Sequence, residues 1–214
     1  MDELRRQVIA TAQCMEAAGL GRGTAGNVSV RAVGGRPGDF LITPSGMPYH
    51  GLVAEDVVRV RADGALEGRR QPSSEWRFHR DLYATRPEAG AIVHAHSPFA
   101  TSLACLRRHL PPFHYMIARF GGDTLRCAAY ATFGTQKLSD AILTAMADRR
   151  GCLLANHGML VFGDDLAHAL ALAVELEALC EQYWRASQLG EPVLLDAAEM
   201  QEVLAKFAAY GQQD

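Results

Sequence analysis

Lysine is nearly absent from this chain of 214 residues, which carries only Lys137 and Lys206. The five cysteines contain no CxxC pair and are odd in number, which argues against a disulfide framework and favours reduced thiols. No run approaches the roughly 18 consecutive apolar residues that span a bilayer, and Met1–Arg6 lacks the apolar segment of a secretory signal. The formal net charge of -3 gives no broad basic surface for nucleic acid or an anionic membrane. We therefore expect a cytoplasmic protein whose partner is a small molecule.

The chain contains ample material for one globular domain over residues 1–214, because 49% of its residues are hydrophobic. Apolar spacing and turn residues predict strands and helices that mix without strict alternation. The expected strands are 28–31, 40–43, 57–61, 91–97, 125–130, 152–155 and 159–162. The first expected helix is amphipathic and is closed by Gly19, and the second begins at the serines and Glu75 of 72–75 and ends at Arg86. Helices are also expected over 98–108 and 136–149. A long helix capped by Asp164 or Asp165 follows, and the last helix runs from Asp196 to Tyr210.

Two histidines two residues apart end an apolar run and are the strongest chemical signal in the chain. Alternate side chains of a strand share a face, so His94 and His96 can bind one ion. His157 follows a second apolar run, and Glu75 precedes the pair, which completes a ligand set suited to zinc. Each residue has an ordinary structural alternative: a strand-end polar pair, a turn histidine and a helix-terminal acid. A cupin-type iron or manganese site is disfavoured, because residues 97–122 contain no Asp or Glu.

Three short turns are candidates for binding a phosphate group. They are rich in backbone N–H and hydroxyl donors, and glycine lets a ligand approach the backbone closely. The serine pair at an expected helix start is the best motivated of them and lies beside Glu75. Each turn, considered alone, is more simply interpreted as an ordinary structural turn than as a phosphate site. The candidate residues are Gly26, Asn27, Ser45, Gly46, Ser73 and Ser74.

Taken together, these motifs resemble the class II aldolase/adducin family over essentially the whole chain. The matching segments are 24–31, 43–46, 72–79, the strand of the two histidines, 114–118, 130–134 and 156–158. The resemblance implies a three-layer α/β fold in which a mainly antiparallel central sheet is flanked by helices on both faces. It also implies a homotetramer with active sites at subunit interfaces.

The resemblance further assigns roles to individual residues. It implies one zinc ion per subunit, with manganese or cobalt as possible replacements, and a carboxylate that alternates between metal ligand and catalytic acid/base. Tyr115 would handle a proton on the aldehyde-side oxygen, while Phe133 and Tyr210 would line the aldehyde end. The implied metal ligands are Glu75, His94, His96 and His157, and the six turn residues named above would hold the phosphate.

The implied reaction is reversible cleavage of a ketose 1-phosphate into dihydroxyacetone phosphate and an aldehyde. L-Fuculose 1-phosphate and the 5-deoxy and 5-methylthio ribulose 1-phosphates are the candidate substrates. The scarcity of lysine agrees with a metal-dependent route, because neither lysine lies in a motif that could form a Schiff base. A phosphosugar epimerase, a sugar-acid phosphate decarboxylase, a methylthioribulose phosphate dehydratase and a non-catalytic adducin head share this fold. Glu75 and Tyr115 favour the aldolase over the epimerase, and the intact ligand set disfavours the adducin head.

Overall fold

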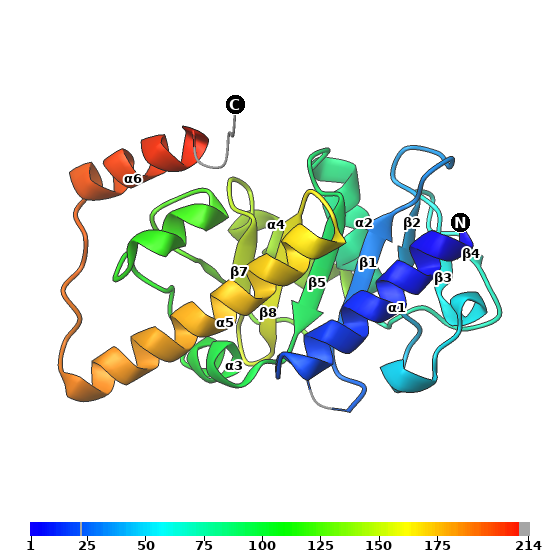
Figure 1. The fold of residues 1–214 in the computed structure, drawn as a ribbon, viewed down its shortest axis with the longest axis horizontal. Helices are drawn as coiled ribbons and strands as arrows, with labels where there is room; N and C mark the ends of the chain where they lie inside the picture. Colours follow the sequence, from blue (N-terminus) through cyan, green and yellow to red (C-terminus); the bar gives the residue numbers. More distant parts are fainter. Residues whose placement is uncertain (22, 210–214) are drawn as a thin grey trace.

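One eight-stranded sheet organises the protein. The computed structural model describes residues 1–21 and 23–209, and the strands lie in the order β4-β3-β2-β1-β5-β8-β7-β6 (Figure 1). Within these residues every neighbouring pair is antiparallel except β6 and β7, which confirms the expected mainly antiparallel sheet. The strands are β1 (Asn27–Arg31), β2 (Phe40–Ile42), β3 (Val58–Val60), β4 (Leu66–Glu67), β5 (Ala91–Ala95), β6 (Cys127–Ala128), β7 (Gly151–Leu154) and β8 (Gly158–Gly163).

Helices cover both faces of the sheet, as the resemblance implied. One face carries α1 (Asp2–Ala17), α3 (Pro98–Cys105) and α5 (Leu166–Leu189). The other face carries α2 (Trp76–Thr85) and α4 (Gln136–Ala145). The remaining helical segments are η1 (Tyr49–Gly51), η2 (Ala54–Asp56), η3 (Tyr115–Phe120) and α6 (Ala197–Ala209).

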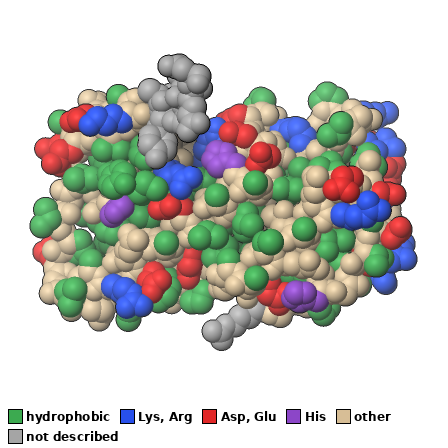
Figure 2. All heavy atoms as spheres, viewed as in Figure 1, with side chains coloured by type: hydrophobic (Ala, Val, Ile, Leu, Met, Phe, Trp, Pro, Cys, Tyr) green, Lys and Arg blue, Asp and Glu red, His purple; other side chains and the backbone are tan. Residues whose placement is uncertain are grey.

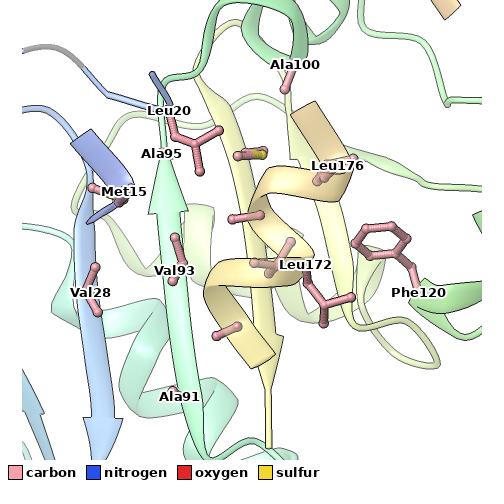
Figure 3. Packing of buried hydrophobic residues seen from close by; sticks show 14 of the residues in the cluster. Met15, Leu20, Val28, Ala91, Val93, Ala95, Ala100, Phe120, Leu172 and Leu176 are labelled. Atoms are coloured by element: carbon pink, nitrogen blue, oxygen red, sulfur yellow. The ribbon is translucent and has the colours of Figure 1, made fainter. Parts of the chain in front are cut away.

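The alternation of side chains along each strand divides the core into two layers. On β5, Val93 packs into the cluster formed with α1 and α5, whereas Ile92 packs into the cluster formed with α2 and α4. Figure 3 shows the first layer, in which Leu172 and Leu176 of α5 lie over the sheet beside Val93. β5 lies between β1 and β8 in a sheet whose two faces are covered by helices, so all of its residues are buried.

Two local predictions were wrong, and one strand was missed. The helix expected from 72–75 begins only at Trp76, and no serine side chain caps it. The hydroxyl of Ser73 accepts from Asn27 and from the backbone N–H of Glu75. The strand expected over 125–130 is reduced to β6, with an isolated bridge between Leu110 and Leu125 before it. The turn at 62–65 is followed by a short strand, β4, that had not been expected.

The C-terminal helix α6 lies apart from the sheet and contacts η3 (Figure 1). Its start was correctly predicted, since Asp196 and Glu199 exchange hydrogen bonds between side chain and backbone in a capping box. In the space-filling view, hydrophobic side chains gather between α6 and α5 (Figure 2). Among the helices of the described ranges, none is long and apolar enough to cross a membrane.

Candidate metal centre and adjoining cleft

Four side chains converge at the end of β5 to form what we call the Glu/His cluster: Glu75, His94, His96 and His157. One ligand atom from each lies within 4.8 Å of the others. The Nε2 atoms of His94 and His96 are 3.0 Å apart. Glu75 places Oε2 at 3.1 Å from Nε2 of His94 and Oε1 at 3.2 Å from Nε2 of His157. The structure thus brings together all four residues that the sequence singled out as metal ligands.

The fold explains this convergence. His94 lies on the same sheet face as Ile92, the face covered by α2, and Glu75 is the residue directly before α2. His157 comes from the tight turn between β7 and β8, where Asn156 has a left-handed φ of 54°. In β5 and β8 His94 pairs with Leu160, which places the β7–β8 turn beside the end of β5. Glu75 and His157, which are 82 residues apart in sequence, therefore meet at the end of the central strand β5.

Two glycines allow the backbone to close around the histidines. Gly26 has a φ of +90°, and a Cβ there would lie 2.7 Å from the carbonyl oxygen of His94. A Cβ on Gly158 would collide with the carbonyl oxygen of Ala95 and would press on the ring of His96. Any larger residue at either position would displace the strand end that carries the two histidines.

The imidazole rings are oriented for a common ion. Nδ1 of His94 donates to the carbonyl oxygen of Met159 at 2.8 Å, which directs Nε2 into the cluster, where it can bind a metal once it is deprotonated. The three rings make interplanar angles of 74° to 76° with centroids 4.7 to 4.9 Å apart. Such a mutually perpendicular arrangement places three nitrogen atoms around one point.

Electrostatics at the cluster also favour a cation. Burial alone would raise the pKa of the Glu75 carboxyl, but His94 and His157 hold that pKa well below its usual range. Burial lowers the pKa of His96 to about 4, and the charges of His94 and His157 act in the same direction. Burial works against it, but the charge of Glu75 raises the pKa of His94. The cluster therefore presents an ionised carboxylate that attracts positive charge, a proton on His94 or a metal ion, beside a neutral imidazole at His96.

The donor set fits a divalent metal. Three ligand-atom pairs in the cluster are 3.0 to 3.2 Å apart, and one ligand atom from each residue lies within 4.8 Å of the others, so a single ion could contact all four residues. Oε1 of Glu75 is buried and has no hydrogen-bond partner of acceptable geometry within the described residues. A buried carboxylate oxygen without a partner is costly unless an ion satisfies it.

A cleft of about 310 Å³ opens beside the cluster. It is lined by all six residues predicted to bind phosphate and by Phe133. Tyr115 is not among the described residues that line it, and its side chain is 51% exposed on η3. Tyr210 lies outside the described residues. The cleft-lining residues are Thr24, Ala25, Gly26, Asn27, Pro44, Ser45, Gly46, Ser73, Ser74, Glu75, His96, Tyr130, Ala131, Phe133, Asn156 and His157.

The serine turn differs from the expected helix terminus. The backbone N–H of Ser73 donates to Thr43, and the N–H of Trp76 donates to the carbonyl oxygen of Ser73. Asn27 donates from Nδ2 to Ser73 Oγ at 2.9 Å and to Glu75 Oε2 at 3.0 Å. The side chain of Asn27 therefore links the predicted phosphate turn to the predicted acid/base.

The sequence reasoning missed a buried polar group behind the cluster. His79 donates to or accepts from Asn27 and Ser29, and Ser29 contacts the hydroxyl of Tyr83. His79 is completely buried on α2. One signal was available: His79 is four residues after Glu75, so the two share one side of the helix.

The two lysines lie away from this chemistry. Lys137 is on α4 and Lys206 pairs with Glu202 on α6 at 2.8 Å. Neither is among the described residues that line the cleft.

Comparison with known proteins connects this geometry to a family. The family described as "Class II Aldolase and Adducin N-terminal domain" matches residues 6–184. The 5-methylthioribulose-1-phosphate/5-deoxyribulose-1-phosphate aldolase of Rhodospirillum rubrum is 52% identical, over 97% of this chain and 92% of that protein. The L-fuculose phosphate aldolase of Haemophilus influenzae is 45% identical, over 98% and 95% respectively. A solved structure of an L-fuculose 1-phosphate aldolase superposes with a TM-score of 0.92 at 39% identity and covers 97% of both chains.

Proposed function

Because the chain belongs to the class II aldolase and adducin family, we propose that it is a metal-dependent aldolase that reversibly cleaves a ketose 1-phosphate into dihydroxyacetone phosphate and an aldehyde. One observation carries the proposal: the Glu/His cluster opens onto a cleft that is also lined by three turns rich in hydroxyl and backbone donors. A small molecule with a phosphate at one end and a carbonyl at the other matches these two parts.

In this proposal His94, His96 and His157 hold a zinc ion, with manganese or cobalt as alternatives, and Glu75 joins them when no substrate is bound. The ion would supply Lewis-acid stabilisation of the negative charge that develops at the ketose carbonyl and C3 hydroxyl. The perpendicular rings and the buried, unpartnered Oε1 support this assignment.

Glu75 is proposed as the acid/base that returns a proton to C3 after the bond between C3 and C4 breaks. Its carboxylate is buried, ionised and held next to the histidines, so it can move only a short distance between the cluster and a bound substrate. A positioned group of this kind contributes about 10²- to 10⁴-fold to the rate of a proton-transfer step.

The phosphate is assigned to Gly26, Asn27, Ser45, Gly46, Ser73 and Ser74, which line the cleft together. Gly46 supports this assignment, because its φ is +66° and no atom lies within 4 Å of the position a Cβ would occupy. The backbone is therefore open to a ligand at that turn. Phe133, 65% exposed at the cleft, is proposed to contact the aldehyde end. The proposed role of Tyr210 there concerns a residue outside the described ranges.

Tyr115 is proposed to take the proton of the C4 hydroxyl in the cluster of a neighbouring subunit. Its exposure on η3 and its absence from the described cleft lining of its own chain support a role across an interface. We accordingly propose a homotetramer with active sites at subunit boundaries.

A coupled assay for dihydroxyacetone phosphate tests the function. The purified, metal-loaded protein would be given L-fuculose 1-phosphate, 5-deoxyribulose 1-phosphate and 5-methylthioribulose 1-phosphate, with epimer and carbon dioxide formation followed in parallel. We expect dihydroxyacetone phosphate and a stoichiometric aldehyde. Formation of an epimer or of carbon dioxide without dihydroxyacetone phosphate would contradict the proposal.

A further inference from the structure

Behind the Glu/His cluster runs a fully buried chain of hydrogen bonds that connects Glu75 to α2. From Glu75 Oε2 it passes to Asn27 Nδ2 at 3.0 Å, and from Asn27 Oδ1 to His79 Nε2 at 2.6 Å. It continues from His79 Nδ1 to Ser29 Oγ at 2.7 Å and ends at the Tyr83 hydroxyl at 2.9 Å. No member is more than 7% exposed.

The chemistry of Glu75 fixes the direction of every bond in this chain. An ionised carboxylate only accepts, so Asn27 must turn its NH₂ group toward Glu75 and its Oδ1 toward His79. His79 must then carry its proton on Nε2 in order to donate to that oxygen. Burial, together with the charge of His94, lowers the pKa of His79 to about 3, so the ring is neutral and its Nδ1 accepts from Ser29. The hydroxyl of Tyr83 completes the series as a donor to Ser29.

The same geometry distinguishes the two oxygens of Glu75. Oε2 accepts from Asn27 and faces His94, whereas Oε1 lies 3.2 Å from Nε2 of His157 and has no hydrogen bond of acceptable geometry within the described chain. Because only Oε2 is held by a hydrogen bond from outside the Glu/His cluster, the carboxylate plane has a single orientation.

We propose that His79 is a positioning residue that acts through Asn27: by locking the amide of Asn27 it anchors Oε2 of Glu75 and reserves Oε1 for the proton at C3. Asn27 also donates to Ser73 in the predicted phosphate turn, so the same amide sets the carboxylate relative to the phosphate end of the substrate. This inference rests on the proposed function and adds a residue that does not line the cleft.

The test compares His79→Phe with His79→Gln. Phenylalanine keeps a flat ring between Phe78 and Phe40 but has no donor, whereas glutamine offers an N–H at the end of its side chain. The measurement is exchange of the C3 proton of dihydroxyacetone phosphate with deuterated solvent, which needs no aldehyde. We expect His79→Phe to lower kcat for exchange about 10- to 100-fold, the usual effect of losing a residue that orients a catalytic or ligating group. The KM and the bound metal should stay near those of the parent, and His79→Gln should recover most of the rate.

Tyr83→Phe is the matched control. It removes a buried hydrogen bond at the far end of the chain but leaves Ser29 able to donate to His79. We expect a loss of thermal stability similar to that of His79→Phe, with exchange near the parent rate. Equal exchange in His79→Phe and the parent would overturn the inference. So would an equal loss in Tyr83→Phe, or a loss in His79→Phe that follows loss of metal.

A measurement on the unaltered protein keeps the inference testable if His79→Phe does not fold. In the metal-loaded parent labelled with ¹⁵N-histidine, NMR should show His79 protonated at Nε2 and unprotonated at Nδ1. A proton on Nδ1 would overturn the proposed chain. If the parent itself neither exchanges the C3 proton nor cleaves a ketose phosphate, the proposed function fails, and that result is distinct from failure of the role of His79.

Discussion

The Glu/His cluster and the aromatic residues Tyr115 and Phe133 are built in opposite ways. Glu75 and His94 are buried, His96 and His157 are partly exposed, and each member is held by a strand end, a tight turn or a buried hydrogen bond. Tyr115 and Phe133 are 51% and 65% exposed, respectively, and stand on segments between the larger elements.

This difference in burial suggests that different residues carry the reaction and the choice of substrate. Groups that move protons or hold an ion need positions fixed to a fraction of an ångström, which strands and buried donors supply. Groups that contact a variable aldehyde can stand on exposed segments, where substitutions disturb the core little. We therefore expect the cluster to determine whether the protein acts at all, and Phe133 to determine on what. Tyr115 is the exception, because we propose that it moves a proton and that a neighbouring subunit completes its position.

Metal removal should have the largest effect. Exhaustive chelation is expected to lower kcat for ketose phosphate cleavage by at least about a thousandfold, because Lewis-acid stabilisation is worth several kcal/mol and each 1.4 kcal/mol is tenfold in rate. Adding back about one zinc per chain should restore activity. Lys137→Ala is the control and should cleave at the parent rate. Full activity of the metal-free protein, or an inactive Lys137→Ala, would point to a Schiff base instead.

Glu75→Gln should have the next largest effect. The amide cannot carry the C3 proton, so exchange in dihydroxyacetone phosphate is expected to fall about 10³-fold, in the middle of the range for general acid/base groups. Three imidazoles remain, so metal content should be largely unchanged by elemental analysis. Glu88→Gln, which alters an exposed carboxylate hydrogen-bonded to Arg86, is the control. Unchanged exchange in Glu75→Gln would remove this residue from the mechanism.

The sequence predicted the cluster well because strand periodicity and turn chemistry are local properties. His94 and His96 share a face of the strand for any register of β5, and the apolar run before His157 shows that this histidine lies at the end of a strand. The sequence could not show that α2 covers the same face of the sheet, and so could not show that Asn27 donates a hydrogen bond to Glu75.

The errors also have physical causes. The hydroxyl of Ser73 accepts hydrogen bonds from Asn27 and from the backbone N–H of Glu75 rather than from the first turn of α2, and local sequence cannot foresee the tertiary bond to Asn27. His79 escaped notice because a buried neutral histidine has the same sequence signature as a surface one. β6 is short because its length depends on pairing with β7 at the edge of the sheet, and the residues of 125–130 alone do not specify this pairing.

Tyr115→Phe should separate cleavage from exchange. Removal of the phenol is expected to lower cleavage by about 10²-fold, the lower end for a proton-transfer group, while exchange at C3 stays intact because the C4 oxygen takes no part in it. Hybrid oligomers of Glu75→Gln and Tyr115→Phe subunits should regain activity, since some sites would combine an intact Glu75 with an intact Tyr115 from the neighbour. Hybrids as inactive as either parent variant would place Tyr115 in the site of its own chain.

Phe133→Ala should have the smallest effect on rate and the clearest effect on selectivity. The ring is exposed at the cleft, so its removal costs little stability, and kcat with the preferred ketose 1-phosphate should change little. An apolar contact of one or two methylenes discriminates by about 10- to 200-fold, so kcat/KM ratios between 5-methylthioribulose and 5-deoxyribulose 1-phosphate should shift within that range. Val33→Ala, an apolar change at a still more exposed residue in the turn between β1 and β2, is the control. If the ratio stays constant in Phe133→Ala while exchange falls, then Phe133 belongs with the Glu/His cluster and the division between reaction and specificity is wrong.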